Sequence, residues 1–396
     1  MTETTDPVGV RTPPADGAEG GAPVAPGAAV AGPGGRHRGR FHPLTVAAVE
    51  RLTDDAVAVT FAVPGDLVEE YAFEPGQHLT VRAVLGGEEV RQSYSICQSR
   101  NAPGGSRRLR VAVARVPGGR MSTWFTDVVR PGDRMEVMTP LGSFTCPTRP
   151  DGIRHHVAIA AGSGITPVLS LITTALEDEP GSRVTLLFGN RRTGTIMFLE
   201  ELEDLKNRFP ERFHLVSVLS REAQDVELFS GRLDRERLER IFATLVPPAT
   251  VDEWYLCGPY RMVLEAEALL LDRGVDPRHV HHEIFHVDDG APRAKVVVND
   301  TAPPEAVVTV NLDGRTTVIP MPTREESILD ATLRSRPDAP YSCTGGVCGT
   351  CRARLVSGQV RMDRNFALEP EEVAAGIVLA CQSHPVTDEV SLDYDA

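Results

Sequence analysis

The stretch Cys343-Thr-Gly-Gly-Val-Cys348-Gly-Thr-Cys351 holds three cysteines in the spacing C-x4-C-x2-C, and a fourth, Cys381, lies well downstream. This is the spacing of plant-type [2Fe–2S] ligands, in which four thiolates hold two irons and two sulfides. One loop can supply three of these ligands only if its backbone wraps tightly, and glycines permit this because they tolerate left-handed dihedral angles. Glycines also let backbone N–H groups approach the cluster sulfurs. We predict a [2Fe–2S] cluster held by Cys343, Cys348, Cys351 and Cys381, with Gly345, Gly346 and Gly349 shaping the loop.

Zinc is the alternative metal for such a group of cysteines. Structural zinc sites usually take their ligands from two C-x2-C-like pairs. This chain has one such pair, Cys348 and Cys351. The spacing therefore favours an iron–sulfur cluster over zinc or over purely structural cysteines.

The cysteine loop lies in a C-terminal segment with its own pattern of secondary structure. Two strands flank an Asp313-Gly314 turn, and a helix is expected from about Ser327 to Arg334, just before the loop. A hairpin, a helix and short final strands are typical of a small α+β domain. We predict this domain over residues 306–396. An Asp-, Pro- and Ala-rich linker precedes it over residues 287–305, where 294–298 could form a strand.

The rest of the chain divides into three further segments. Residues 1–40 are rich in Pro, Gly and Ala without a period, which predicts a disordered tail. Residues 41–150 contain short β-branched runs, such as 44–49 and 56–61, between Pro-Gly and Gly-Gly turns, which predicts an antiparallel β-barrel. Residues 151–286 alternate strands and helices, which predicts an α/β domain with a parallel sheet and helices on both faces. Its strands are expected at 156–160, 183–188, 215–219 and 253–256.

Charge and length limit the classes of function. The chain has 396 residues and a net charge of −14, from 41 basic and 55 acidic residues. This length predicts two or three domains, and the acidic balance argues against nucleic acid as the main partner. Residues 306–396 carry 8 Arg against 13 Asp and Glu, a net charge of −5. We hypothesise that a partner with a basic patch docks there, although acidic surfaces also serve solubility.

Cysteine usage and the N-terminus predict the compartment. Seven unevenly spaced cysteines, among them Cys97, Cys146 and Cys257, do not form a disulfide framework and suit a reducing compartment. The first residues lack the basic start and apolar core of a signal peptide. No run of about eighteen apolar residues is present. We expect a cytoplasmic protein that does not attach to a membrane.

Two glycine-rich turns have the form of phosphate-binding sites. Residues 119–123 precede a helical stretch, and a helix N-terminus offers N–H groups and a positive dipole end to an anion. An ordinary helix cap is the alternative there. Residues 162–167, Gly-Ser-Gly-Ile-Thr-Pro, lie between a strand and a helix, where a backbone can approach a pyrophosphate. The predicted contacts are Gly119, Arg120, Met121, Ser122 and Thr123 at the first turn and Gly162, Gly164 and Thr166 at the second.

The end of the next strand bears on the type of nicotinamide cofactor. Asn190, Arg191 and Arg192 follow the strand at 183–188, and no acidic residue lies within 188–196. An acid at this place would bind ribose hydroxyls, whereas arginine suits a 2′-phosphate. This favours NADPH, with NADH as the alternative. The alternative is that Arg191 and Arg192 are ordinary exposed arginines on a loop.

A third turn, Cys257-Gly258-Pro259, ends the strand at 253–256. A thiol here would lie near the nicotinamide. The alternative is a buried cysteine acting as a small hydrophobic residue. Together with the two preceding turns, the position favours the functional role.

These motifs have the order found in a known superfamily. Residues 41–286 resemble the ferredoxin–NADP reductases, with Cys-Gly-Pro near the end and Glu283-Ile-Phe285 closing the domain, and residues 306–396 resemble a plant-type ferredoxin of the β-grasp fold. Several stretches look like the reductase subunits of phenylacetyl-CoA epoxidases: Phe41-His-Pro-Leu-Thr-Val46, Ala160-Ala-Gly-Ser-Gly-Ile-Thr-Pro167, Gly189-Asn-Arg191, Asn365-Phe-Ala-Leu-Glu-Pro370 and Leu379-Ala-Cys-Gln-Ser383.

The resemblance also implies site residues on the strand at 90–97. Flavin barrels of this superfamily carry Arg-x-Tyr-Ser, in which the arginine pairs with the pyrophosphate, the tyrosine packs on the flavin and the serine reaches the ring near N5. Tyr94 and Ser95 match, but Gln92 stands at the arginine position and Arg91 one residue earlier. Because side chains alternate along a strand, Arg91 is expected to point away from the side of Tyr94. Either residue is therefore a candidate for the phosphates.

These parts together imply a reductase. A nicotinamide delivers two electrons as a hydride and a cluster accepts one at a time, so FAD must stand between them. We expect hydride transfer from NADPH at Thr166 and Cys257, assisted by Ser95 and Glu283, with Phe285 also at the cofactor. The resemblance implies that the electrons go to the oxygenase subunit of a multicomponent monooxygenase, a di-iron epoxidase acting on an aromatic CoA thioester.

No oxygen-activating metal site is evident in this chain. Glu283 and His286 form one Glu-x-x-His, whereas a helix-bundle di-iron site needs two such motifs on helices. Two other functions stay open: a reductase for a Rieske-type aromatic-ring or steroid hydroxylase, and a redox sensor whose cluster regulates a partner. Rapid multiple-turnover reduction of cytochrome c or ferricyanide would favour the enzyme over the sensor.

Overall fold

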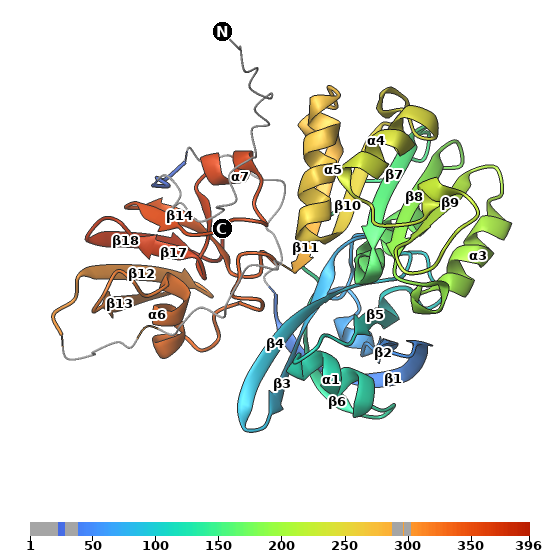
Figure 1. Cartoon of the computed structure of the whole chain (residues 1–396). Helices are drawn as coiled ribbons and strands as arrows, with labels where there is room; N and C mark the ends of the chain where they lie inside the picture. The colour runs from blue at the N-terminus through green and yellow to red at the C-terminus, as the bar shows by residue number, and fades with distance from the viewer. Residues whose placement is uncertain (1–22, 28–38, 287–295, 297–301) are drawn as a thin grey trace, which may run out of the picture.

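The described residues form three large sheets, which follow one another along the sequence, and a separate two-stranded pair in the last domain (Figure 1). The computed structural model describes residues 23–27, 39–286, 296 and 302–396. Most of the predicted tail and linker lies outside these residues, as does most of the strand considered at 294–298. Short 3-10 helices lie at Gly65–Leu67, Gly105–Arg107, Gly162–Gly164, Thr193–Thr195, Glu227–Phe229, Pro248–Thr250 and Pro277–His279.

The first sheet is antiparallel and closes into a barrel. Its strands are β1 (Phe41–Thr53), β2 (Ala56–Ala62), β3 (His78–Leu85), β4 (Glu88–Ser95), β5 (Arg108–Ala114) and β6 (Arg134–Met138), in the order β4-β3-β6-β1-β2-β5. Ile96, directly after β4, bridges Val111 in β5, so the two ends of this order meet. Helix α1 (Arg120–Asp127) covers the barrel and buries Met121 and Phe125 in its core.

The second sheet is parallel throughout. Its strands are β7 (His155–Ala161), β8 (Arg183–Asn190), β9 (Phe213–Leu219), β10 (Glu253–Pro259) and β11 (Val280–His286), in the order β11-β10-β7-β8-β9. Helices α2 (Ile165–Asp178) and α3 (Leu199–Arg208) pack on one face, and α4 (Arg235–Thr244) and α5 (Tyr260–Asp272) on the other, each with its own core cluster. The chain runs outward from β7 to β9 and resumes on the other side of β7 at β10. Ligands of such sheets bind where the strand order reverses, at the carboxyl ends of the strands.

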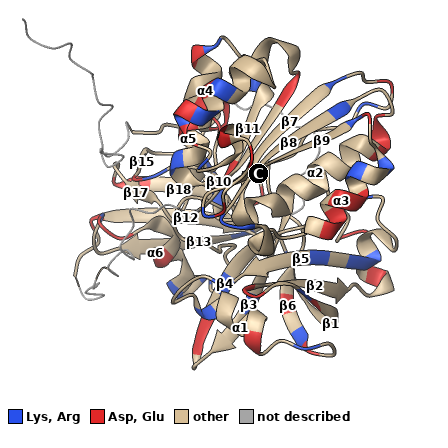
Figure 2. Cartoon of the chain, turned by 45° about the vertical axis from the view of Figure 1, so that its right-hand side comes forward, with Lys and Arg blue, Asp and Glu red and all other residues tan. Residues whose placement is uncertain are grey.

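Exposed ion pairs link the helices of this second domain. Acidic and basic residues are interspersed over α3, α4 and α5 (Figure 2). Arg235 of α4, for example, pairs with Glu239 on its own helix and with Asp272 of α5. Single exposed pairs add little stability, so the buried faces of α4 and α5 do most to hold these helices.

The C-terminal domain combines one mixed sheet with two short helices. Strands β12 (Ala306–Leu312), β13 (Arg315–Met321), β14 (Arg352–Ser357), β16 (Ile377–Leu379) and β18 (Glu389–Asp393) lie in the order β13-β12-β18-β14-β16. Strands β15 (Val360–Met362) and β17 (Ser383–Pro385) form a separate pair, and the helices are α6 (Ile328–Ser335) and α7 (Pro370–Ala374). Asp313 and Gly314 both have positive φ, as the predicted two-residue hairpin turn requires. The three domains confirm the predicted fold class.

A segment of the predicted tail, residues 23–27, lies on the C-terminal domain rather than on the barrel that follows it in sequence. Val24 N–H donates to the carbonyl of Val360 at 2.7 Å, and Val360 N–H donates back at 3.0 Å. The Val24 side chain packs on the core of this domain. A Cβ on Gly27 would lie 2.3 Å from the carbonyl carbon of Ala375, so only glycine fits here. The prediction of disorder therefore differs from the structure at these residues, because amino-acid composition carries no information about pairing with a strand that is distant in sequence.

The helices offer no membrane-crossing element. Within the described ranges, none of them combines the length and the apolar character that a bilayer span requires.

Candidate functional site

The four predicted cluster cysteines come together at one end of the C-terminal domain. Cys351 and Cys381 are buried, and Cys343 and Cys348 are partly exposed. The backbone N–H groups of Gly345 and Cys348 both point at Cys343 Sγ, at 3.4 Å. Gly346 and Gly349 have positive φ, and a Cβ on Gly346 would lie 3.1 Å from the Arg364 carbonyl. The loop thus wraps as tightly as a plant-type ligand loop must.

The thiolate form is favoured at one cysteine of this loop, Cys343. A hydrogen bond from the Cys348 thiol and the surrounding backbone N–H groups lower the pKa of Cys343 to about 6, against the opposing effect of burial. At Cys351, the hydrogen bond with Cys381 and burial raise the pKa of the thiol instead. Four converging sulfurs with N–H donors aimed at one of them fit a [2Fe–2S] cluster.

Ser95, Glu283 and Cys257 meet where the barrel faces the parallel sheet. Ser95 Oγ donates to Glu283 Oε2 at 3.3 Å, and Cys257 is paired with Glu283 in the register of β10 and β11. Burial raises the pKa of Glu283 to about 8, although the Ser95 hydroxyl partly opposes this. Burial also raises the pKa of the Cys257 thiol, which is fully enclosed in the core and therefore stays protonated. Phe285, two residues beyond Glu283, is exposed.

His78 belongs to this site but was not found by sequence reasoning. It lies opposite Ser95 in the register of β3 and β4, and its Nδ1 is 3.9 Å from Glu283 Oε1. Burial lowers the pKa of His78 to about 4. Near pH 7 the contact therefore joins two neutral groups. A histidine in an unremarkable strand gives no local signal, since its neighbours come from distant segments.

Two buried polar atoms here have no hydrogen-bond partner among the described residues: His78 Nε2 and the hydroxyl of Tyr94. Orphaned buried polar atoms are costly and usually mark a missing ligand or water. The Tyr94 ring packs edge-on against Phe125 of α1, at 5.1 Å between centroids. These observations fit a bound flavin beside Tyr94, Ser95 and His78.

Arg91 and Gln92 point to opposite sides of β4. Gln92 is exposed on the face of Tyr94, at the position where the superfamily has arginine. Arg91 is buried and donates to the carbonyls of Ala339, at 3.3 Å, and Pro337, at 3.5 Å, in the C-terminal domain. Its guanidinium also lies 4.0 Å from the centre of the Tyr341 ring. Arg91 thus contacts the C-terminal domain, and its role at the phosphates stays a prediction.

The turn at residues 119–123 forms the first turn of α1, with Gly119 as its N-cap. Ser122 Oγ donates to the Gly119 carbonyl and accepts from Val116 N–H, so its hydroxyl is already hydrogen-bonded within this segment. Arg120 pairs with Glu88 on β4, and Met121 is buried in the barrel core. Thr123 is bonded through its own N–H to Gly119. A phosphate role for these residues stays a prediction.

The turn at Gly162–Gly164 and the end of β10 form the switch point of the parallel sheet. A Cβ on Gly164 would lie 2.2 Å from the Cys257 carbonyl oxygen, and one on Gly258 would lie 3.2 Å from Ala161 N. Gly162 and Gly258 both have positive φ. Thr166 is buried and its hydroxyl donates to the Ser163 carbonyl. Pro259 follows as the N-cap of α5. The two predicted motifs therefore form one backbone cradle, in which a side chain at Gly164 would not fit.

The end of β8 holds the residues predicted to select the nicotinamide. Asn190 is buried, and its Nδ2 has no partner among the described residues. Arg191 pairs with Asp55 of the barrel at 3.2 Å. Glu222, from the loop after β9, accepts from Thr193 N–H and hydroxyl at 2.9 and 2.6 Å and lies near the charge of Arg192. Although residues 188–196 contain no acid, acidic residues from other segments therefore lie next to this loop in space.

The C-terminal domain contacts both other domains close to the cysteine loop. Ser93 Oγ on β4 donates to the Ser342 hydroxyl at 2.9 Å, directly before Cys343. Val347 of the loop packs against the core of the parallel-sheet domain, and Phe366 packs edge-on against Tyr260 of α5 at 5.2 Å. Ser93 and Ser95 lie on the same face of β4, one two-residue step apart. Ser93, which bonds the residue before the cysteine loop, is thus about 7 Å along β4 from Ser95.

Comparisons with known proteins identify each domain. The family "Oxidoreductase FAD-binding domain" matches residues 43–146, "Oxidoreductase NAD-binding domain" matches 158–267, and "2Fe-2S iron-sulfur cluster binding domain" matches 310–386. These matches confirm FAD, a pyridine nucleotide and a [2Fe–2S] cluster as the cofactors.

Relatives of known activity cover nearly the whole chain. The E component of 1,2-phenylacetyl-CoA epoxidase from Escherichia coli K12 is 45% identical over 90% of this chain and 98% of its own length. The ferredoxin reductase component of 3-ketosteroid-9-alpha-monooxygenase from Rhodococcus rhodochrous is 34% identical over 90% and 98%. The fold matches that of phthalate dioxygenase reductase with a TM-score of 0.54 and 24% identity, over 89% of this chain and 98% of that one. The chain belongs to the family of FAD- and NAD-binding [2Fe–2S] reductases that includes the E component of phenylacetyl-CoA epoxidase.

Proposed function

We propose that this chain takes electrons from NADPH and supplies them to the di-iron oxygenase component of a phenylacetyl-CoA epoxidase. The similarity to the E. coli protein over nearly the whole of both chains supports this choice. The observation that best supports electron transfer from the flavin to the cluster is the hydrogen bond between Ser93 and Ser342. It holds the cluster loop beside the strand that carries Tyr94 and Ser95.

The residues of the site have different roles. The backbone cradle of Gly162, Gly164 and Gly258 binds the nucleotide pyrophosphate at the switch point. When bound, FAD accepts a hydride from a nicotinamide, and the [2Fe–2S] cluster carries single electrons. Ser95 and Glu283 line the reacting edge, where a protonated Glu283 can hold or release one proton through the Ser95 hydroxyl. Cys257 packs beneath, as a protonated thiol.

NADPH stays our preference over NADH. Arg191 and Arg192 border the loop where a 2′-phosphate would lie. Asp55 and Glu222 already neutralise part of this charge, so the discrimination is expected to be modest. Comparing kcat/KM for NADPH and NADH in the wild type and in Arg192→Ala tests this. A preference that Arg192→Ala leaves unchanged would contradict it.

A steroid hydroxylase is the second candidate partner, because the Rhodococcus reductase is 34% identical over the same extent. The test combines the purified holoprotein with either oxygenase and its substrate and measures product formed per NADPH consumed. We expect coupled turnover with the epoxidase. Coupled turnover with the steroid hydroxylase alone would overturn the assignment, and NADPH oxidation with no product from either would favour the redox-sensor alternative.

A further inference from the structure

Three metal-binding side chains converge at a place that the electron route does not use. Cys146 lies in the connection between the barrel and β7, Glu253 begins β10, and His281 is the second residue of β11. One ligand atom of each lies within 4.8 Å of those of the other two. We call them the Cys146–Glu253–His281 cluster. It lies near the amino ends of β10 and β11, away from the carboxyl ends where the nucleotide binds.

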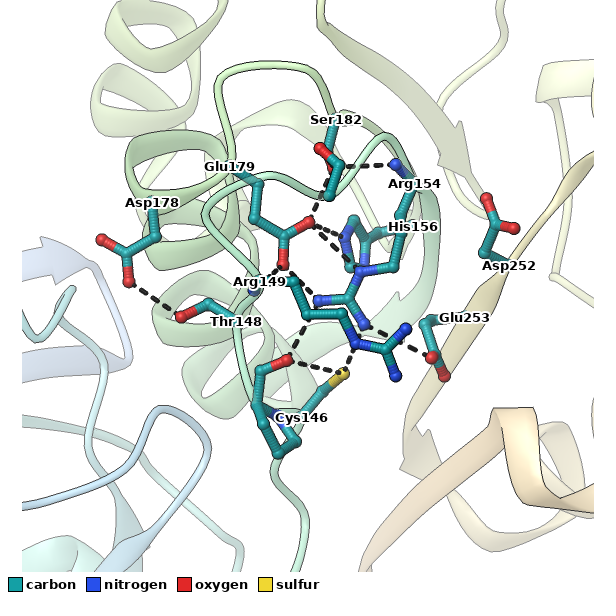
Figure 3. A network of polar contacts seen from close by, with 12 residues as sticks. Cys146, Thr148, Arg149, Arg154, His156, Asp178, Glu179, Ser182, Asp252 and Glu253 are labelled. Atoms are coloured by element: carbon teal, nitrogen blue, oxygen red, sulfur yellow. Dashed lines mark hydrogen bonds and ion pairs between the residues drawn. The ribbon is translucent and has the colours of Figure 1, made fainter.

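Surrounding contacts fix the orientation of these ligands. Glu253 Oε2 is 3.0 Å from His281 Nε2 and 3.4 Å from His279 Nδ1, while its Oε1 accepts from Arg154 Nη1 at 3.4 Å. The His281 ring stacks on Tyr255, at 5.4 Å between centroids and 22° between planes. Figure 3 shows Cys146, Arg154 and Glu253 facing one another in this network. Ligands of protein metals are typically held by such outer contacts.

The charges around the cluster include one guanidinium, that of Arg154, which contacts both Glu253 and Cys146. The buried guanidinium of Arg154 forms its main ion pair with Glu179, to which it donates from Nε and Nη2. His156 and Ser182 also donate to Glu179, and together with Arg154 they hold its pKa well below the usual range, against the effect of burial. Two carboxylates, Glu179 and Glu253, therefore face one guanidinium. Arg154 Nη1 also lies 3.5 Å from Cys146 Sγ.

We propose that Cys146, Glu253 and His281 bind one Zn²⁺, with His279 or water as the fourth ligand. A thiolate, a carboxylate and an imidazole form a donor set typical of zinc. With bond lengths of about 2.0–2.3 Å, tetrahedral ligands lie about 3.3–3.8 Å apart, so side-chain shifts of about 1 Å complete the site. Binding forms the Zn–S bond and releases the thiol proton of Cys146 to water.

Such a metal would join three segments that are far apart in sequence. It would tie the exit of the barrel to the last two strands of the parallel sheet. Strand β11 carries Glu283 two residues beyond His281, so zinc would also fix the strand that positions the flavin-side carboxyl. The role we assign to zinc is therefore structural.

The experiment uses the untagged full chain with FAD and the iron–sulfur cluster loaded. Equilibrium dialysis against buffered Zn²⁺, followed by elemental analysis, gives zinc and iron per chain for the wild type, Cys146→Ser, His281→Gln and Cys97→Ser. Cys97 is a buried thiol outside the cluster and serves as the matched control. We expect one zinc per chain in the wild type and in Cys97→Ser, and at least tenfold weaker binding in the other two, with equal iron in all four.

X-ray absorption at the zinc edge provides a second measurement, which does not depend on any variant folding. One sulfur at about 2.3 Å with nitrogen and oxygen at about 2.0–2.1 Å would agree with the proposal. The proposal is overturned if the wild type binds no zinc above the Cys146→Ser level, or if its zinc has no sulfur neighbour. A zinc bound by several sulfurs would also overturn it, since that metal would occupy the iron–sulfur cysteines.

Discussion

The carboxyl group of Glu283 is enclosed between two domains, and this burial has a measurable cost in folding stability. Its pKa is raised from 4.5 to about 8 by burial. Between these values the folded protein binds a proton that the unfolded chain has lost. Stability should therefore fall as pH rises through this window.

We predict that Glu283→Gln removes this part of the pH dependence. A neutral amide bears no titrating charge, so the variant should gain stability relative to wild type as pH rises from 5 to 8. The full difference is on the order of a few kcal/mol, since each pKa unit corresponds to about 1.4 kcal/mol. Chemical denaturation of both proteins at pH 5, 6, 7 and 8 measures it. Glu69→Gln, at an exposed position, is the control, and parallel curves for wild type and Glu283→Gln would contradict the prediction.

Arg91 provides a second prediction at the scale of one residue. Its contacts to Ala339, Pro337 and Tyr341 hold the C-terminal domain on the barrel. Arg91→Ala should slow cytochrome c reduction roughly tenfold, because hydrogen bonds of a buried charged group are worth about 1.5–3 kcal/mol. Ferricyanide reduction, which can draw electrons from the flavin directly, should change little.

Arg82→Ala is the matched control for Arg91. Arg82 lies opposite Arg91 in the register of β3 and β4 and, like Arg91, pairs with Glu89; its second ion pair is with Glu136 of the barrel. It should therefore leave both rates near those of the wild type. Equal losses of both activities in Arg91→Ala would show that the arginine supports the barrel or the flavin instead of the interdomain contact.

At the scale of elements, the segment 23–27 gives the clearest prediction. Val24 exchanges two backbone hydrogen bonds with Val360. Val24→Pro removes the N–H donor, whereas Val24→Ala keeps it and loses only part of the side chain. The Val360 amide should exchange with solvent at least tenfold faster in Val24→Pro than in Val24→Ala, because local opening frees it. Hydrogen-exchange mass spectrometry measures this, and equal exchange in both variants would rule out the contact.

Elements were predictable where the signal is local. The strand and turn at Ala160-Ala-Gly-Ser-Gly, the Asp313-Gly314 hairpin and the cysteine loop each specify their conformation within about ten residues. Contacts between distant segments had no such signal. Val24 on Val360, His78 beside Glu283, and Glu222 at Thr193 all depend on the tertiary fold. Arg91 is an intermediate case, because strand alternation predicted the direction of its side chain but not its contacts with the C-terminal domain.

The whole molecule has separable cores, which predicts how it responds to loss of metal. The core of the C-terminal domain is distinct from those of the barrel and the parallel sheet. Cys381→Ser should lower bound iron and abolish cytochrome c reduction, because one of four thiolate ligands is gone. NADPH-dependent ferricyanide reduction should stay within about twofold of wild type, since the flavin side keeps its own core. Iron analysis and the two assays measure this, and loss of ferricyanide reduction would show that the cores are coupled.

The attachment of residues 23–27 also determines what an amino-terminal probe would report. A dye placed just before Pro23 would move with the iron–sulfur domain, although the flavin barrel is its nearest neighbour in sequence. Paired with a second dye on α3, it would follow the distance between that domain and the nucleotide-binding sheet. Single-molecule fluorescence on such a pair could therefore count docked and undocked molecules during turnover, without any label near the cysteines.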